Sequence, residues 1–403
     1  MKKSFWEVGH KPTLFSAFLY FDLSFMVWVL LGPLAVQISS DLHLTPAQKG
    51  LMVATPVLAG ALLRIVMGVL VDQLQPKKAG LIGQLIVIFA LLFAWLHGID
   101  SFQQTLLLGI FLGFAGASFA VALPLASRWY PPEHQGMALG IAGAGNSGTV
   151  FAALFAPSLA VAFGWNNVLG MALIPLMVTL VIYTLLAKDS PEAAPPKTLR
   201  QYVAILKDKD AWWFMFFYSV TFGGFVGLAS SLTIYFNDQY ELTPVMAGYF
   251  TAACVFAGSL ARPLGGLIAD RIGGIRTLLV MYAIAGLFLL AMSTTPAALP
   301  AALLIVVLIM SALGMGNGAV FQLVPQRFRK EIGVMTGLVG MAGGVGGFYL
   351  AASLGWCKQL TGDYQMGLIA FAFLTVLAIL GLSSVKTRWR TTWGSATMTT
   401  ARV

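Results

Sequence analysis

Long apolar runs recur along the whole chain, and each run is long enough to cross a membrane as a helix. About 20 residues at 1.5 Å rise per residue cover the ~30 Å hydrocarbon layer of a bilayer. Twelve runs are present, at 13–38, 47–71, 79–97, 104–127, 136–161, 168–187, 211–236, 246–270, 276–294, 298–324, 333–355 and 364–384. Only 10% of the 403 residues are charged, against roughly 25% in a soluble domain. The sequence therefore predicts an all-α membrane protein with twelve transmembrane helices.

The net charge of +9 is distributed in a way that indicates membrane orientation rather than a nucleic-acid partner. Most lysines and arginines fall in alternate connections between the runs or near the two ends of the chain. Short cytoplasmic loops carry such an excess of basic residues. We therefore expect a multi-pass protein of the bacterial inner (cytoplasmic) membrane, in contact with the lipid bilayer and with both termini in the cytoplasm. Lys49 and Lys358 fall on the opposite side, and Arg64 and Arg262 fall within runs.

The two halves of the chain repeat one another. An arginine, a glycine and an aspartate recur at a shift of 198 residues, as Arg64, Gly68 and Asp72 and then Arg262, Gly266 and Asp270. Three glycines recur at a shift of 197, as Gly136, Gly140 and Gly143 and then Gly333, Gly337 and Gly340. Parallel repeats of this kind are known in transporters. We predict an N-terminal six-helix bundle at 1–187, a polar cytoplasmic linker at 188–210, and a C-terminal six-helix bundle with a cytoplasmic tail at 211–403.

The loops after the second run of each half resemble the loop motif of the major facilitator superfamily, which reads roughly GxLaDrxGrk. The copy at 266–276, GLIADRIGGIR, fits well. The copy at 68–78, GVLVDQLQPKK, has Gln73 and Gln75 where Arg and Gly are usual, which weakens a gate role for that loop. The resemblance implies the major facilitator fold, with two pseudo-symmetric six-helix bundles. The candidate gate residues of these loops are Asp72, Asp270 and Arg271.

Arg64 and Arg262 are charged side chains within predicted transmembrane helices, where each costs at least ~2.5 kcal/mol. Each lies eight residues before the loop aspartate of its half, which places it about 12 Å into the membrane. The parallel repeat would turn the two guanidinium groups toward one central cavity. Their repulsion favours an anion between them, and the planar fork of arginine suits a planar oxyanion. If each arginine instead paired with a buried acid, Asp22 would be the only candidate within a predicted span, and one carboxylate cannot neutralise both.

Glycine-rich segments in the fifth and eleventh runs make the resemblance more specific. GIAGAGNSG at 140–148 and GLVGMAGGVGG at 337–347 resemble the paired signatures of the nitrate/nitrite porter family of the major facilitator superfamily. Close helix packing is the ordinary role of such glycines, and we assign it to Gly140, Gly143, Gly145, Gly337, Gly340, Gly343 and Gly344. Packing alone does not need Asn146. The resemblance implies that nitrate or nitrite is bound by the two arginines together with Asn146, Tyr218, Phe119 and Phe222.

The depth of these residues in the membrane agrees with a shared site. Counting helical rise from the ends of their runs places Phe119 and Asn146 near the level of the arginines. Tyr218 and Phe222 are four residues apart and therefore lie on one helix face. For the aromatic residues alone, core packing is the more ordinary interpretation. Nitrate is flat and weakly hydrated, so that aromatic walls suit it. The tenth run, with Asn317 and Phe321, also resembles the family, but no direct contact follows from the sequence.

These features together predict a secondary active transporter for nitrate, with nitrite second, and not an enzyme. No ATP-binding loop of the form GxxxxGK[ST] is present, and we expect no cofactor and no metal site. The alternatives are an organic-anion or organophosphate carrier with paired basic residues, or a membrane sensor with a transporter fold.

Coupling to protons and nitrate/nitrite exchange both remain open. Asp22 lies nine residues into the first run from Thr13, which places it near the depth of the arginines. It is the candidate proton carrier, because burial in a membrane protein disfavours the charged form of a carboxyl group. An Asp22 held by hydrogen bonds to neighbouring helices is an equally good interpretation.

Replacing either arginine with lysine keeps the charge and removes the planar donor fork. We predict that Arg64→Lys and Arg262→Lys each weaken nitrate binding by about tenfold or more, measured as the Kd of the purified protein. Binding within about twofold of the wild type in both variants would rule out a site formed by two arginine forks.

Overall fold

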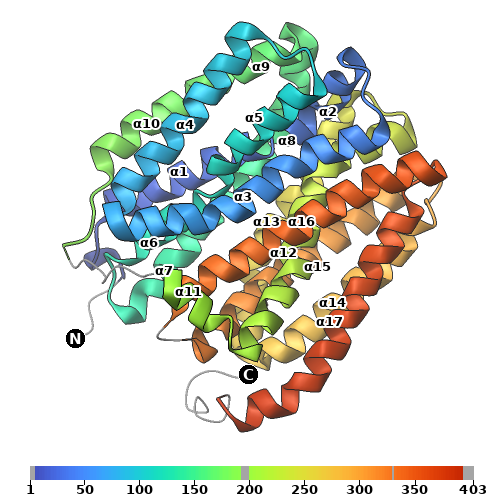
Figure 1. The fold of residues 1–403 in the computed structure, drawn as a ribbon. Coiled ribbons are helices and arrows are strands. Elements are labelled where there is room, and N and C mark those ends of the chain that lie inside the picture. The colour runs from blue at the N-terminus through green and yellow to red at the C-terminus, as the bar shows by residue number, and fades with distance from the viewer. Residues whose placement is uncertain (1–4, 192–198, 329–330, 394–403) are drawn as a thin grey trace.

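The computed structural model describes residues 5–191, 199–328 and 331–393, and these residues form helices and connecting turns without a β-strand (Figure 1). The elements of the first half are η1 (Phe5–Glu7), α1 (Lys11–Trp28), α2 (Leu31–Asp41), α3 (Pro46–Leu74), α4 (Pro76–His97), α5 (Phe102–Gly116), α6 (Phe119–Ser127), α7 (Pro132–Gly143), η2 (Ala144–Ser147), α8 (Gly148–Phe163), α9 (Trp165–Met171) and α10 (Leu173–Leu186). Those that follow are α11 (Leu199–Ile205), α12 (Lys209–Tyr240), α13 (Pro244–Ile272), α14 (Gly274–Ser293), α15 (Leu299–Arg327), α16 (Ile332–Thr361) and α17 (Gln365–Thr391).

Within the described residues, twelve segments are long and apolar enough to cross a membrane, so the predicted all-α fold with twelve spans is confirmed. The helices extend beyond the apolar runs. The last run was expected to end at 384, whereas α17 ends at Thr391, and α12 begins at Lys209 rather than 211. Helical hydrogen bonds continue past the edge of an apolar run. Hydropathy does not detect these end turns, because their side chains are polar. The earlier start of α12 brings Asp210 into the helix, so Asp22 is not the only acid within a span.

Four spans of the first half are interrupted, whereas α12 to α17 each cross as one helix. Two of the breaks follow from prolines, since Pro33 and Pro175 have no N–H to continue the helical bonding of the preceding turn. At the break between α5 and α6, the backbone N–H of Ala120 bonds to Ala117 O at 2.9 Å. The carbonyl of Gly116 is therefore left for another donor.

The two halves meet mainly where α16 crosses α3, α13 packs on α8, and α12 packs on α2 (Figure 1). We call the end that carries α11, the start of α1 and the end of α17 the linker end, and the opposite end the far end. The close approaches between halves run from the middle of the molecule to the far end: Gly344 lies against Ala61, and Gly355 lies against Gly50.

Polar contacts join the halves at the far end. The Nζ of Lys49 lies 3.5 Å from Oδ1 of Asp238, and the backbone N–H of Ala47 donates to Oε1 of Gln359 at 3.1 Å. The far end is therefore closed by packing and by an ion pair between the halves.

At the linker end, ion pairs join helices of the same half. Asp210 accepts hydrogen bonds from Arg327 Nε at 2.9 Å, from Trp389 Nε1 at 2.8 Å, and from Arg388. These contacts tie the ends of α12, α15 and α17 together. The predicted linker at 188–210 contains α11 and residues 192–198, which lie outside the described residues, so the predicted domain limits stay a prediction.

The turn between α3 and α4 holds Gln75 in a backbone conformation that favours glycine. Its φ is +69° and its ψ is 156°. The equivalent residue of the second half, Gly273, has a φ of +100° and a ψ of 140°. A side chain in this region costs roughly 1–3 kcal/mol. Gln75 is also the position at which the loop motif usually has glycine.

We predict that Gln75→Gly stabilises the detergent-purified protein by about 1 kcal/mol, because the relief of strain exceeds the larger unfolded-state entropy of glycine. Gly273→Gln should destabilise the protein by a similar amount. Thermal unfolding of both variants measures this, and a Gln75→Gly variant that melts below the wild type would contradict the prediction.

Candidate anion site

Arg64 on α3 is 2% exposed and is held by groups from both halves. Its Nε donates to Gly116 O at the end of α5 at 3.3 Å, and its Nη1 donates to Gly340 O on α16 at 2.5 Å. The Nη2 atom is buried and has no hydrogen-bond partner. The guanidinium carbon lies over three aromatic rings, at 5.7 Å from the centroid of Trp28, 5.2 Å from Phe119 and 5.3 Å from Phe222.

Arg262 on α13 is half-buried and has fewer contacts. Its guanidinium carbon lies 5.7 Å from the ring centroid of Phe321, and its side chain is within hydrogen-bonding reach of the Tyr218 hydroxyl. Its Nη1 atom is buried without a partner. Arg64 and Arg262 are close enough to repel each other, and Tyr218 interacts with both. The structure thus brings the two arginines together from opposite halves.

Aromatic rings form a wall beside the arginines. Tyr218 and Phe222 stack with ring centroids 5.1 Å apart and an interplanar angle of 4°. Phe321 on α15 meets Tyr218 edge-on at 5.0 Å and 89°, and its centroid lies 6.3 Å from that of Phe119. The sequence did not place Phe321 or Trp28 at the site. One sequence feature could have indicated Phe321. It lies in the tenth span, which is the counterpart in the second half of the fourth span, and the fourth span carries Phe119.

Asn146 and Asp22 lie near one turn of the first half, η2. Asn146 is buried in η2, which packs against α1 and α13, the helix of Arg262. Its Oδ1 has no hydrogen-bond partner. Asp22 accepts a hydrogen bond from Ser147 Oγ at 2.6 Å and another from the backbone of Gly148. Among the described residues Asp22 forms no ion pair with Arg64 or Arg262. Its place is at the turn that carries Asn146.

Six of the seven signature glycines fall into two groups. In the first, a Cβ atom would meet a neighbour: at Gly145 it would lie 2.5 Å from Phe21, at Gly340 3.0 Å from Arg64 Nη1, at Gly343 2.7 Å from Tyr218, and at Gly344 2.6 Å from Ala61. In the second group, Gly140 and Gly143, a Cβ atom would meet nothing within 4 Å. In this structure Gly140 and Gly143 have no close neighbour, so their packing role stays a prediction. Gly337 is half-buried in α16.

The predicted gate residues lie at the linker end. Asp72 forms an ion pair with Arg128 at 3.1 Å, within the first half. Asp270 and Arg271 are exposed at the end of α13. Their role in gating stays a prediction.

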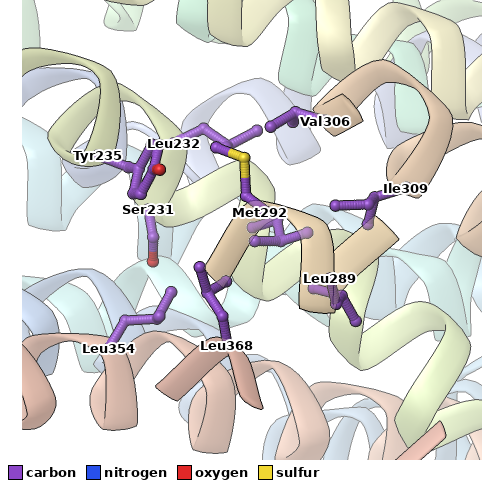
Figure 2. A pocket seen from close by; sticks show the side chains of 10 residues that line it. Ser231, Leu232, Tyr235, Leu289, Met292, Val306, Ile309, Leu354 and Leu368 are labelled. Atoms are coloured by element: carbon purple, nitrogen blue, oxygen red, sulfur yellow. The ribbon is translucent and has the colours of Figure 1, made fainter. Parts of the chain in front are cut away.

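A small cavity elsewhere in the second half does not suit an anion. It lies between α12, α14, α15, α16 and α17, and Figure 2 shows Leu232, Met292, Ile309 and other apolar side chains around it. Its lining includes Ser231 and Tyr235 but no basic residue. The paired arginines therefore remain the candidate anion site.

Comparison with known proteins shows the family of the chain. The sequence pattern of the Major Facilitator Superfamily matches residues 15–351. A nitrite extrusion protein of Bacillus subtilis is 34% identical over 351 residues, which cover 86% of this chain and 87% of that protein. A probable nitrate transporter, NarT, of Staphylococcus carnosus is 34% identical over 358 residues, covering 88% of this chain and 91% of that protein. The chain belongs to the nitrate/nitrite porter family of the major facilitator superfamily. The resemblance predicted from the glycine segments is confirmed.

A probable nitrate/nitrite antiporter, NarK1, of Thermus thermophilus is 30% identical over 398 residues, covering 90% of this chain and 88% of that protein. Among solved structures, a bacterial homolog of the human lysosomal transporter Spinster in an inward-facing and occupied conformation aligns with a TM-score of 0.74. The alignment covers 93% of this chain and 96% of that one at 16% identity. This likeness shows the major facilitator fold. Members of the superfamily are carriers, which confirms that the protein is not an enzyme.

Gly343 and Gly140 offer a matched pair of substitutions on the two glycine-rich spans. We predict that Gly343→Ala weakens nitrate binding by about fivefold or more, because the new methyl group would displace the Tyr218 and Phe222 rings. Gly140→Ala should leave the Kd unchanged, since the methyl group points into open space. The Kd of each purified variant measures the difference. Equal affinity of both variants for nitrate would show that the ring positions do not matter for binding.

Proposed function

We propose that this protein is a secondary active transporter that carries nitrate, and secondarily nitrite, across the bacterial inner membrane by alternating access. The observation that carries the proposal is the pair Arg64 and Arg262, which come from opposite halves and each hold a buried guanidinium nitrogen without a partner. An anion between them would accept from both nitrogens and neutralise the repulsion between the two charges. Relatives named as nitrate transporter, nitrite extrusion protein and nitrate/nitrite antiporter support the choice of anion.

The surroundings of the arginines favour a small planar oxyanion over a phosphate ester. Two arginine forks offer paired donors in a plane, and the stacked Tyr218 and Phe222 rings supply flat apolar walls. A phosphate group has more charge and more acceptor atoms, and would need more donors than these walls offer. The Tyr218 hydroxyl, which interacts with both arginines, is a further polar group of the site. We propose the Asn146 amide, on a turn that packs against α13, as another.

The contacts between the halves support an alternating-access cycle. They run from the level of Arg64 to the far end, while Gly140 and Gly143 on α7 remain uncovered. The basic residues of the linker end assign that end to the cytoplasm, so this conformation is closed toward the outside. Opening outward would separate Lys49 from Asp238 and uncover the seam between α3 and α16. The bundles at 1–187 and 211–403 would move as the two units, joined by the linker at 188–210.

Counterflow into proteoliposomes tests the function directly. Vesicles loaded with nitrate or nitrite should take up labelled external nitrate, and the Arg64→Lys, Arg262→Lys double variant should not. Absence of counterflow by the wild type would overturn the proposal. Strong inhibition by an organophosphate, with no inhibition by excess nitrite, would favour an organic-anion carrier instead.

Asp22 is the proposed proton carrier. Its hydrogen bonds allow a substitution that removes the titratable group and keeps the local structure. The amide introduced by Asp22→Asn would keep an oxygen to accept from Ser147 Oγ, so the turn that carries Asn146 should keep its shape. We predict that wild-type nitrate uptake rises as external pH falls, and that Asp22→Asn keeps nitrate exchange but loses accumulation driven by a pH gradient. Flux measured with and without an imposed gradient separates the two activities. Undiminished gradient-driven accumulation by the variant would eliminate Asp22 as the proton site.

A further inference from the structure

Trp28, the last residue of α1, is fully buried between α3 and α5. Its indole Nε1 donates to Pro56 O on α3 at 2.7 Å. Two glycines make room for the ring. A Cβ atom on Gly60 of α3 would lie 2.8 Å from the indole Nε1, and a Cβ atom on Gly116 of α5 would overlap the ring. The indole is therefore fixed in position by a hydrogen bond and by two helices that approach it closely.

The same residues hold Arg64. The guanidinium carbon lies 5.7 Å from the centroid of the Trp28 ring, and Nε donates to the carbonyl of Gly116, the glycine that packs against this ring. That carbonyl is available because α5 ends there and Ala120 bonds to Ala117 instead. The Trp28 ring and the carbonyl of Gly116 are therefore neighbours, and both contact the Arg64 side chain.

The second half repeats the two glycines but not the tryptophan. Gly258 and Gly314 stand 198 residues after Gly60 and Gly116, and the residue at that shift from Trp28 is Val226. The ring of Phe225, which stands 197 residues after Trp28, packs against Gly258, and Gly258 and Gly314 approach each other backbone against backbone. Among the described residues, the ring contact of the Arg262 guanidinium is with Phe321. Because α15 continues unbroken through Gly314, the helix keeps its own carbonyl bonds. Arg262 is half-buried and, in the part of the chain that the structure describes, has no carbonyl contact like the one between Arg64 and Gly116.

We propose that Trp28 is a positioning residue that fixes Arg64 in the anion site, so that the first half supplies the stationary arginine and the second half the movable one. The expected effect of Trp28 on nitrate transport rests on the proposed function. Its expected effect on the position of the Arg64 side chain rests only on the contacts of Arg64. An indole face in a dry site attracts a guanidinium group more strongly than a phenyl face does, and an aliphatic side chain offers no such attraction.

The test compares nitrate counterflow by Trp28→Leu, Trp28→Phe and the wild type, with Trp165→Leu as the matched control. Trp165 is also buried and donates its indole N–H, at 2.6 Å to Oδ2 of Asp41, but it lies at the far end. We expect Trp28→Leu to raise the KM for nitrate by about tenfold, with a smaller change in maximal rate per folded protein. Trp28→Phe should recover part of the loss, and Trp165→Leu should leave the KM unchanged.

Combination with Arg64→Lys separates positioning from general destabilisation. If Trp28 acts through Arg64, Trp28→Leu should add little to the KM of Arg64→Lys. An equal loss in both backgrounds, or an unchanged KM for Trp28→Leu, would overturn the proposal.

A second measurement does not depend on nitrate. Phenylglyoxal modifies arginine side chains, and mass spectrometry reports the rate at each site. The rate at Arg64 should rise severalfold in Trp28→Leu and stay unchanged in Trp165→Leu. If the wild type proved unable to exchange nitrate while this rise was found, the proposed function would fail and the positioning role would stand. An unchanged rate at Arg64 would contradict the positioning role itself.

Discussion

The presence of two arginines that repel each other inside a membrane protein, Arg64 buried and Arg262 half-buried, is the constraint on which the rest of this structure depends. A guanidinium group within a membrane protein must find acceptors or an anion. Arg64 finds two carbonyls, one from its own half and one from the other. Each arginine still has one buried nitrogen without a partner. We propose that this remaining hydrogen-bonding capacity serves a small anion between the halves.

The contacts of Arg64 also explain how binding and movement are connected. Its Nη1 bonds to Gly340 on α16, and its guanidinium lies over Phe222 on α12, so this side chain already bridges the two bundles. An anion held by both arginines would add a second bridge. The halves are not equivalent: α15 is unbroken where the first half breaks at Gly116, and Arg64 lies over Trp28 whereas the ring contact of Arg262 among the described residues is with Phe321. We interpret the first half as the rigid side of the site.

Much of this arrangement follows from sequence patterns, and the remainder depends on packing that such patterns do not contain. Hydropathy located all twelve spans, and the repeat at a shift of 198 residues identified Arg64 and Arg262 as a pair. Hydropathy averages over each run, so it does not show the break at Gly116 that frees a carbonyl. The glycine spacing did not distinguish Gly343, which lies against aromatic rings, from Gly143, which faces open space. That difference depends on which end of the molecule is closed.

Residues outside the repeat were the hardest to place. The residue 198 positions after Trp28 is Val226, and Phe321 lies at a shift of 202 from Phe119. The repeat at a shift of 198, which identified the arginines as a pair, therefore did not indicate either residue. Asp22 was placed by helical rise at the level of the arginines. Rise gives depth but not direction around the helix, and its carboxylate lies against Ser147 instead.

The most direct test of the account is a solid-state NMR distance measurement on the protein in lipid, with ¹⁵N-labelled nitrate and ¹³C at the ζ carbons of arginine. The account predicts dipolar coupling of one nitrate to two guanidinium carbons at about 4 Å. Arg64→Lys should abolish the coupling to one of these carbons, and Arg262→Lys should abolish the coupling to the other. A bound nitrate that couples to neither or only one of these carbons in the wild type would contradict the two-arginine site.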